Sequence, residues 1–347
     1  MRGVVRAAAY LPSYTDGAVR RCGADEDEFT LAATVLERAL PRLPERSPLT
    51  VRLLGFRSPP SGAALSAVAG RPVTVEGAGE QVGSLAAALA SLAASDRAEC
   101  LIVARRLSRG EPPIDPADRG EGSAALVVDD GGDAIPLSTF RPTAPVRADP
   151  LTQLWAWLGG PGGLGSVGVG DWVAPVPARG QGAVPDLPDG PPYTVAEGAF
   201  VPAPRYQESL RSRWRFLADR CQACGERTFP SRGRCGRCGR TDALRDEPLP
   251  LDGAKVVAST WIGQGGQPTE FDPQVEATGP YGVVLAELEP GVRVTLPVAD
   301  AEREQVSVGA RVDTRLRRLY AIEGAWRYGR KAVPAPRRGE PPAPDGT

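Results

Sequence analysis

The sequence predicts an α/β domain, followed by a small metal-binding module and an all-β domain. Strand-like and helix-like patterns alternate over residues 1–150, which favours a layered α/β sheet. Two C-x-x-C pairs then stand ten residues apart, and five strand patterns fill most of the stretch from 254 to 332. A chain of 347 residues is long enough to give two or more domains a core of their own.

The first 150 residues carry five strand patterns and two helical ones. A strand is predicted where an apolar run ends at a turn residue, and a helix where apolar residues recur every three to four positions. The predicted strands are Val4–Leu11, Val51–Phe56, Val73–Val75, Cys100–Ala104 and Ala124–Val128, and the predicted helices are Asp25–Leu40 and Gly83–Ala94. The strands are apolar on both faces, so we expect a largely buried sheet.

A linker is predicted at 151–199, where glycine and proline dominate; seven of the twelve residues from Gly159 to Gly170 are glycine. A short helix is predicted at Arg205–Phe216. Its apolar side is expected to hold Tyr206, Leu210, Trp214 and Phe216. Residues 335–347 are mainly Pro, Arg, Gly and acidic residues, a composition that is typical of a disordered tail.

The four cysteines of the two pairs are Cys221, Cys224, Cys235 and Cys238. Each pair is followed by a glycine, which accepts the positive φ that such a turn tends to need. Two turns supply four thiolates, the donor set of a closed, structural zinc site with no position left for water. Paired disulfides and a redox-active C-x-x-C are the metal-free alternatives. The helix and this module are assigned to 200–245.

The five later strand patterns are Ala254–Ile262, Tyr281–Glu289, Val292–Val298, Arg311–Leu319 and Trp326–Ala332. A Glu-Pro-Gly turn separates the second pattern from the third, as in a hairpin. Five short strands in about 85 residues fit a small closed or partly open barrel, for which the OB-fold is the usual solution. This domain is assigned to 246–334.

Composition excludes several classes of function. The chain has no histidine, so a Ser-His-Asp triad, a Cys-His dyad and a histidine base are all excluded. Its net charge of −1 gives no general attraction to nucleic acid or membrane. We expect no signal peptide and no membrane span, and therefore a cytoplasmic protein. Cys22 and Cys100 remain outside the four-cysteine frame, too few for a secreted disulfide scaffold.

Residues 205–240 hold ten arginines and three acidic residues. They could form an anion-binding surface for the phosphates of a nucleotide-like cofactor or of nucleic acid, or simply a solvated face. A zinc ribbon beside an OB barrel suggests the alternative that the chain binds single-stranded nucleic acid. Such binding would need exposed aromatic residues on the barrel. Acidic residues spread over the barrel region disfavour that alternative.

The second half of the chain resembles a known family. The segments that carry the resemblance are 201–206, 212–216, both C-x-x-C-G pairs, Phe229-Pro230, 281–296 and 308–312. They look like the rubredoxin-like zinc ribbon that precedes an OB-fold in acyl-CoA-associated proteins. That resemblance implies a subunit that partners a thiolase-superfamily enzyme, an aldolase or a hydratase, and that helps hold or pass CoA thioesters. Candidates for contacts with CoA phosphates are Arg211, Arg213 and Arg215.

The first half resembles the N-terminal half of a thiolase fold of the hydroxymethylglutaryl-CoA-synthase type, through segments 3–12, 25–32, 58–60 and 120–128. The stretch comparable to that family's nucleophile turn is 77–85, which has no cysteine and places Glu80 at the nucleophile position. Glu80 is a weak candidate for a general base, and otherwise an acid at a helix start. The family's histidine-bearing second half is missing, so we expect no condensation by this chain alone.

The sequence thus predicts a noncatalytic scaffold subunit of an acyl-CoA-processing complex, with structural Zn²⁺ and with a CoA thioester as the candidate bound ligand. One alternative is an active subunit of an acyl-CoA lyase, aldolase or hydratase complex. The other is a single-strand nucleic-acid binder.

Overall fold

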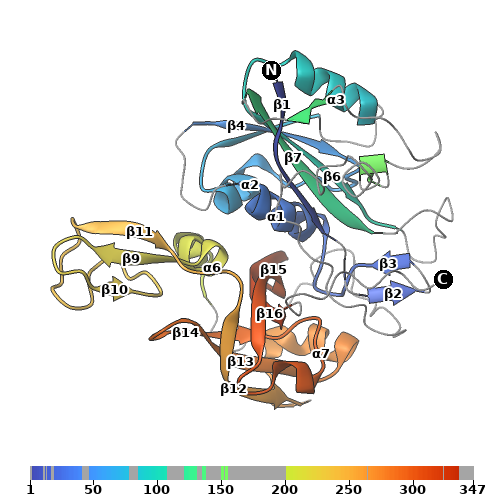
Figure 1. Cartoon of the computed structure of the whole chain (residues 1–347). Coiled ribbons are helices and arrows are strands. Elements are labelled where there is room, and N and C mark those ends of the chain that lie inside the picture. The colour runs from blue at the N-terminus through green and yellow to red at the C-terminus, as the bar shows by residue number, and fades with distance from the viewer. Residues whose placement is uncertain are drawn as a thin grey trace. The chain divides into compact units, whose positions relative to one another are not determined.

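The structure is a computed structural model (Figure 1). It describes residues 2–10, 12, 14–16, 19–40, 47–77, 85–107, 121–130, 135–137, 150–151, 153–154, 201–263, 265–322 and 324–335. The described residues up to 154 belong to one compact unit and those from 201 onward to a second, and each unit is described by itself. The predicted linker at 151–199 lies almost wholly outside the described residues, as does nearly all of the predicted tail at 335–347.

The first unit is built on a six-stranded mixed sheet with the strand order β5-β4-β6-β7-β1-β8. β4 pairs in parallel with β5 and β6, whereas the remaining ladders are antiparallel. The strands are β1 (Arg2–Tyr10), β4 (Leu49–Leu54), β5 (Val73–Glu76), β6 (Glu99–Arg105), β7 (Gly122–Asp130) and β8 (Ile135–Pro136); β2 (Tyr14–Asp16) and β3 (Val19–Arg21) form a separate hairpin. All five predicted strands of this unit are present.

The helices of this unit whose bounds are described are α1 (Glu28–Ala39), α2 (Gly62–Ala69) and α3 (Leu85–Ala94). Asp27 caps the start of α1. Its side chain accepts a hydrogen bond from the Thr30 amide, and the Thr30 hydroxyl accepts one from the Asp27 amide, so both of these backbone N–H groups have a partner. α1 packs against β1, β6 and β7, and the Ser123 hydroxyl of β7 donates to its Leu31 carbonyl over 2.9 Å. α2 was not predicted, although Ser61 caps its start and Gly70 ends it with φ 70°.

The second unit begins with two short helices, α5 (Ala203–Glu208) and α6 (Leu210–Arg215). The prediction of one helix over Arg205–Phe216 is therefore wrong, because the helix is interrupted at Ser209. The Ser209 amide donates to carbonyls of both Arg205 and Tyr206, and its ψ of −1° breaks the α-helical path. Phe216 then ends α6 in the left-handed region, with φ 48°.

A three-stranded antiparallel sheet follows, in the order β10-β9-β11. We call it the ribbon sheet: β9 (Leu217–Cys221), β10 (Arg227–Thr228) and β11 (Leu244–Pro248). The last sheet has five strands in the order β14-β13-β12-β15-β16. Its strands are β12 (Ala254–Ile262), β13 (Tyr281–Glu289), β14 (Val292–Pro297), β15 (Arg311–Ile322) and β16 (Ala325–Pro334), with 3₁₀ turns η3 (Thr269–Phe271) and η4 (Arg303–Val306) and helix α7 (Asp272–Thr278) between them.

All five predicted strands of this sheet are present, and β15 and β16 are longer than predicted. Its edge strands do not form a ladder with each other. Within the described residues, the backbone pairing between these two edges is one parallel bridge, from Val298, just after β14, to Ala332 of β16. A closed barrel is therefore not found, and the observed element is an antiparallel five-stranded sheet. α7, which has proline in its first turn, was not predicted.

The ribbon sheet and the five-stranded sheet share one hydrophobic core. Phe216, which ends α6, and Ala218 of β9 lie in the same buried cluster as Val256, Val284 and Val312 of the larger sheet. Phe229, from the loop after β10, packs against that cluster. The two sheets therefore support each other through apolar contacts, and folding of one affects the stability of the other.

No helix in the described part of the chain has the length and apolarity needed to cross a bilayer.

Candidate metal centre and the arginines around it

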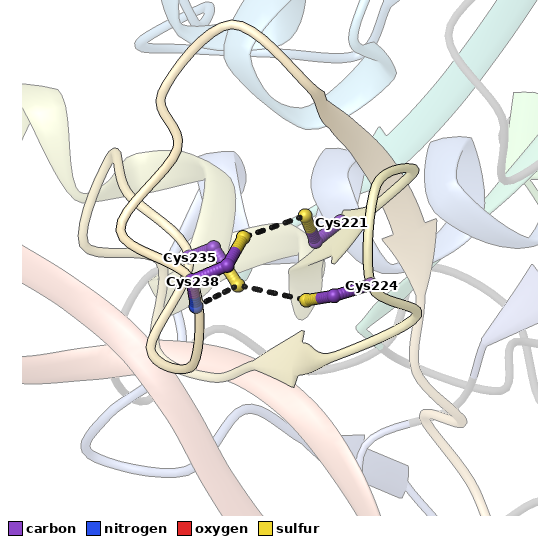
Figure 2. Close-up of side chains that lie close together, drawn as sticks. All are labelled: Cys221, Cys224, Cys235 and Cys238. Atoms are coloured by element: carbon purple, nitrogen blue, oxygen red, sulfur yellow. Dashed lines mark hydrogen bonds between the residues drawn. The ribbon is translucent and has the colours of Figure 1, made fainter.

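The four predicted cysteines converge on one point of the ribbon (Figure 2). Their Sγ atoms all lie within 4.8 Å of one another. The Sγ atoms of Cys221 and Cys238 are 3.6 Å apart, and those of Cys224 and Cys235 are 3.5 Å apart. These separations are too long for disulfides, whose S–S bond is about 2.05 Å. A tetrahedral ion with metal–sulfur bonds of about 2.3 Å requires sulfurs about 3.8 Å apart, so the donor set fits a single metal ion.

Two similar turns aim the sulfurs at this point. The Gly225 amide donates to the Cys221 carbonyl over 2.9 Å, and the Gly239 amide donates to the Cys235 carbonyl over 3.1 Å. Both glycines have positive φ, 73° and 74°, as the sequence predicted. A Cβ atom at either position would meet nothing within 4 Å, so the backbone conformation, rather than space, requires glycine.

Backbone amides also act on the sulfurs. The amides of Cys238 and Arg237 approach the Cys235 Sγ at 3.5 and 3.4 Å. The Cys238 amide is the main cause that lowers the pKa of Cys235, to about 6. The pKa of Cys224 is raised to about 12: the Glu226 amide lowers it, but burial and hydrogen bonds with the other three thiols outweigh that effect. The pKa values of Cys224 and Cys235 thus move in opposite directions.

The ribbon is tied to the five-stranded sheet by Arg227, which lies between the two cysteine pairs. Its guanidinium donates to both carboxylate oxygens of Glu247 on β11, at 2.9 and 2.8 Å. It also donates to Glu289 at the end of β13, over 2.8 Å. The hydrogen bond from Arg227 is the main cause that lowers the pKa of Glu247. Phe229 adds an edge-to-face contact with Phe216, with ring centroids 5.6 Å apart.

The three arginines proposed for CoA phosphates lie in different surroundings. Arg211 of α6 donates to the buried Asp219 over 3.2 Å and also to Asp246. Arg213 is exposed, and its Nε donates to the Ser209 hydroxyl over 2.7 Å. Arg215 is half-buried, and burial lowers its pKa. Arg211, although exposed, therefore joins α6 to the ribbon sheet, while the exposed Arg213 is hydrogen-bonded to the first residue before its own helix.

The aromatic residues of this unit mostly contact one another. Trp214 lies edge-on to Tyr206 and Tyr328, at 6.4 and 6.2 Å, and the Tyr206 hydroxyl donates to the Tyr328 carbonyl. Phe271 stacks on Tyr281 at 5.6 Å and tilts against Tyr320 at 5.4 Å. Sequence reasoning placed Tyr206 and Trp214 on one side of a helix, and both are buried there. Such packed rings leave little free surface on which bases could stack.

The candidates of the first unit are either buried or outside the described residues. Glu80 and Ser84 lie outside them. Cys100 is fully buried in β6, and burial raises its pKa to about 12, which makes it an inert core thiol. Cys22 is buried too, and its amide donates to Glu121. Glu121 accepts a hydrogen bond from the Leu107 amide, and Glu26 accepts one from the Tyr10 hydroxyl. These contacts were not predicted, because they join segments far apart in the sequence.

The fold and the site define a four-cysteine ribbon joined to a five-stranded antiparallel sheet. No family model matches the chain. Curated proteins of three archaea, each named "DUF35 domain-containing scaffold protein", are similar to this chain. That of Methanocaldococcus jannaschii is 32% identical over 127 residues, 36% of this chain and 85% of the relative. Those of Methanothermobacter thermautotrophicus and Pyrococcus furiosus are 30% and 31% identical, each over 90% of the relative. The chain belongs to this family of DUF35 domain-containing scaffold proteins.

Two solved structures are also similar over part of the chain. One is "Ltp2-ChsH2(DUF35) aldolase", with a TM-score of 0.29 and 19% identity over 37% of this chain and 90% of that chain. The other is "MvaS in complex with 3-hydroxy-3-methylglutaryl coenzyme A", with a TM-score of 0.28 and 16% identity over 38% of this chain and 40% of that chain.

Proposed function

We propose that this chain is a noncatalytic scaffold subunit of an acyl-CoA-processing complex. It docks a thiolase-superfamily enzyme, or a related aldolase or hydratase, and helps hold or pass CoA thioesters. The observation that carries the proposal is the similarity to curated scaffold proteins over 85% or more of their length. The four-cysteine ribbon supports it, because a metal held by four protein ligands builds structure and has no open position for chemistry.

The metal of this proposal is zinc. Cys221, Cys224, Cys235 and Cys238 would hold it, and four thiolates at these separations suit its tetrahedral preference. Bound zinc supplies folding free energy to the ribbon. The chain's own residues set up the rest of the site: the Arg237 and Cys238 amides stabilise the Cys235 thiolate, and Arg227 fixes the loop between the pairs.

The domain assignments are part of the proposal. The sheet order β14-β13-β12-β15-β16, with a parallel bridge from Val298 to Ala332, supports an OB-fold at 246–334, because one further ladder at that bridge would close the sheet. A thiolase-like half-domain at 1–150 is proposed from the motifs of the sequence. The helices and ribbon at 200–245 stand between them, and 151–199 is the proposed linker.

Accessible arginines would bind the phosphates of a CoA thioester. Arg213 is exposed, with one hydrogen bond to Ser209, and it is the best placed of the three candidates. Arg211 neutralises two aspartates and is the worst placed. Catalysis is assigned to the partner, because this chain has no histidine and its Cys100 thiol is buried with a raised pKa.

Co-expression with a thiolase-superfamily protein encoded beside this chain tests the proposal. We expect the two to co-purify and elute together from a size-exclusion column as a stable heteromer at micromolar concentration. Clean separate elution at that concentration would contradict the scaffold function.

A further inference from the structure

The ribbon sheet places two arginines directly opposite each other. Arg220 of β9 pairs in register with Arg245 of β11, and Arg227 of β10 pairs with Arg220 from the other side. Paired positions on neighbouring antiparallel strands project their side chains from the same face of the sheet, about 5 Å apart. The three arginines therefore share one face.

Only one of the three has its charge matched. Arg227 is held by Glu247 and Glu289, as described above, and it occupies both oxygens of Glu247. Arg220 lies close enough to Glu247 to contribute to the lowering of that carboxyl's pKa, after Arg227. Arg220 and Arg245 are both exposed, and within the described ranges neither forms an ion pair.

The opposite face of the same sheet shows how the fold treats a like-charge pair. There Asp219 of β9 stands directly opposite Asp246 of β11, one position along from the arginines. Arg211 of α6 bridges both carboxylates, and Ser231 donates its hydroxyl to Asp219 over 2.6 Å. The chain thus supplies its own countercharge to the aspartate pair. Among the described residues, no carboxylate bridges Arg220 and Arg245 in the same way.

We propose that Arg220 and Arg245 form a docking site for carboxylates on an acidic surface of the partner protein that this scaffold holds. The inference rests on the proposed scaffold function and names the chemistry of one of its interfaces. Like charges directly opposite each other destabilise an antiparallel pair, so the isolated chain gives up stability at this position. An interface that contributes two carboxylates converts that repulsion into charge-assisted hydrogen bonds.

Protein carboxylates fit this site better than phosphates. Arg220 lies on the central strand β9 and is paired with neighbouring strands on both sides, so it offers no nest of free N–H groups to a phosphate. Glu247 and Glu289 flank the same row, and they repel a doubly charged phosphate more strongly than a singly charged carboxylate.

The first test asks whether replacing either arginine raises or lowers the thermal stability of the full chain. At low ionic strength we expect Arg245→Gln and Arg220→Gln each to raise the thermal midpoint of the metal-loaded chain by about 1–3 °C. The gain should vanish in about 1 M NaCl, where the Debye length is about 3 Å. The matched control is Arg232→Gln, an exposed arginine of the same ribbon outside any strand pair, which should change nothing. A lower midpoint for either variant would mean that the pair is structural, and would overturn the proposal.

The second test is binding of a defined acidic probe. A hexaglutamate peptide, titrated into the labelled full chain, should shift the Nε–Hε resonances of Arg220 and Arg245. We expect Arg220→Gln/Arg245→Gln to weaken this binding at least about fivefold, and Arg232→Gln to leave it within twofold. Equal loss in the control, or tighter binding of inorganic phosphate or a thymidine oligonucleotide at the same two resonances, would overturn the proposal.

The partner complex separates this inference from the scaffold function itself. If the wild-type chain and the double variant bind the partner equally, the docking site is refuted and the scaffold function stands. If the wild-type chain forms no complex, the scaffold function fails, and the docking proposal fails with it. Weaker, less salt-sensitive binding by the double variant supports both.

Discussion

Arg227 of the ribbon donates a hydrogen bond to Glu289 at the end of β13, over 2.8 Å. This contact links the loop between the two cysteine pairs to the five-stranded sheet. The same guanidinium binds Glu247 of β11 through two hydrogen bonds. One side chain thus joins the metal loop, the ribbon sheet and the larger sheet, so the two halves of this unit should unfold together.

Replacing Arg227 with Gln should lower the free energy of unfolding of the second unit by about 1–2 kcal/mol, because three charge-assisted hydrogen bonds are lost from a mostly buried position. Chemical denaturation followed by tryptophan fluorescence measures the change. Arg240→Gln is the control: Arg240 pairs only with the exposed Asp242, and its loss should have almost no effect. Equal effects for both variants would contradict the bridging role.

The effect of Arg227→Gln should also depend on pH. The hydrogen bond from Arg227 holds the pKa of Glu247 below its ordinary value, so the pair contributes stability above the unfolded pKa of about 4.3 and loses it as pH falls. We expect the full difference between wild type and variant at pH 7 and a smaller one near pH 3. A difference that stays constant over this range would show that the ion pair does not carry the effect.

Metal removal should unfold the ribbon and weaken the five-stranded sheet, because Phe229 and Arg227 lie between the cysteine pairs and contact that sheet. A strong chelator, or Cys224→Ser, should abolish amide protection around 217–248 in hydrogen exchange and reduce it in β13. The first unit, which holds no ligand of this site, should keep its protection. Unchanged exchange in the ribbon after metal removal would contradict a structural metal.

Arg211 and Arg213 should respond in opposite ways. Arg211→Gln leaves the buried Asp219 facing Asp246 without a cation, and should cost about 1–3 kcal/mol of stability. Arg213→Gln should leave stability almost unchanged and weaken CoA binding, which isothermal titration calorimetry can measure. If Arg211→Gln weakens CoA binding at unchanged stability, the assignment of these two arginines is reversed.

Glu80→Gln tests the alternative that this chain takes part in catalysis. In the assembled complex we expect unchanged turnover, because the chemistry is assigned to the partner. A large loss of kcat at unchanged KM would instead favour an active lyase, aldolase or hydratase subunit in which Glu80 is a general base.

Sequence alone predicted the elements that depend on local pattern. The cysteine frame was found because both pairs are complete within four residues, and the β12 and β13 boundaries because their apolar runs end at turn residues. α2 was missed although Ser61 and Gly70 mark its ends, since eight residues give little helical periodicity. The break at Ser209 was missed because serine is compatible with both a helix and its end.

The roles of single arginines could not be predicted in the same way. Whether Arg211 pairs with carboxylates depends on the register that places Asp219 opposite Asp246, and register is set by tertiary contacts. The same holds for Arg220 and Arg245, which lie 25 positions apart in the sequence. The local excess of arginine was visible in the sequence, whereas its division into paired and exposed residues required the fold.

Sedimentation velocity of this chain mixed with the thiolase-superfamily protein proposed as its partner tests the scaffold claim most directly. At micromolar concentration in about 0.1 M salt, the account predicts that both proteins move in one faster boundary, with the stoichiometry constant as either is added in excess. Two independent boundaries with the sedimentation coefficients of the separate proteins would contradict it.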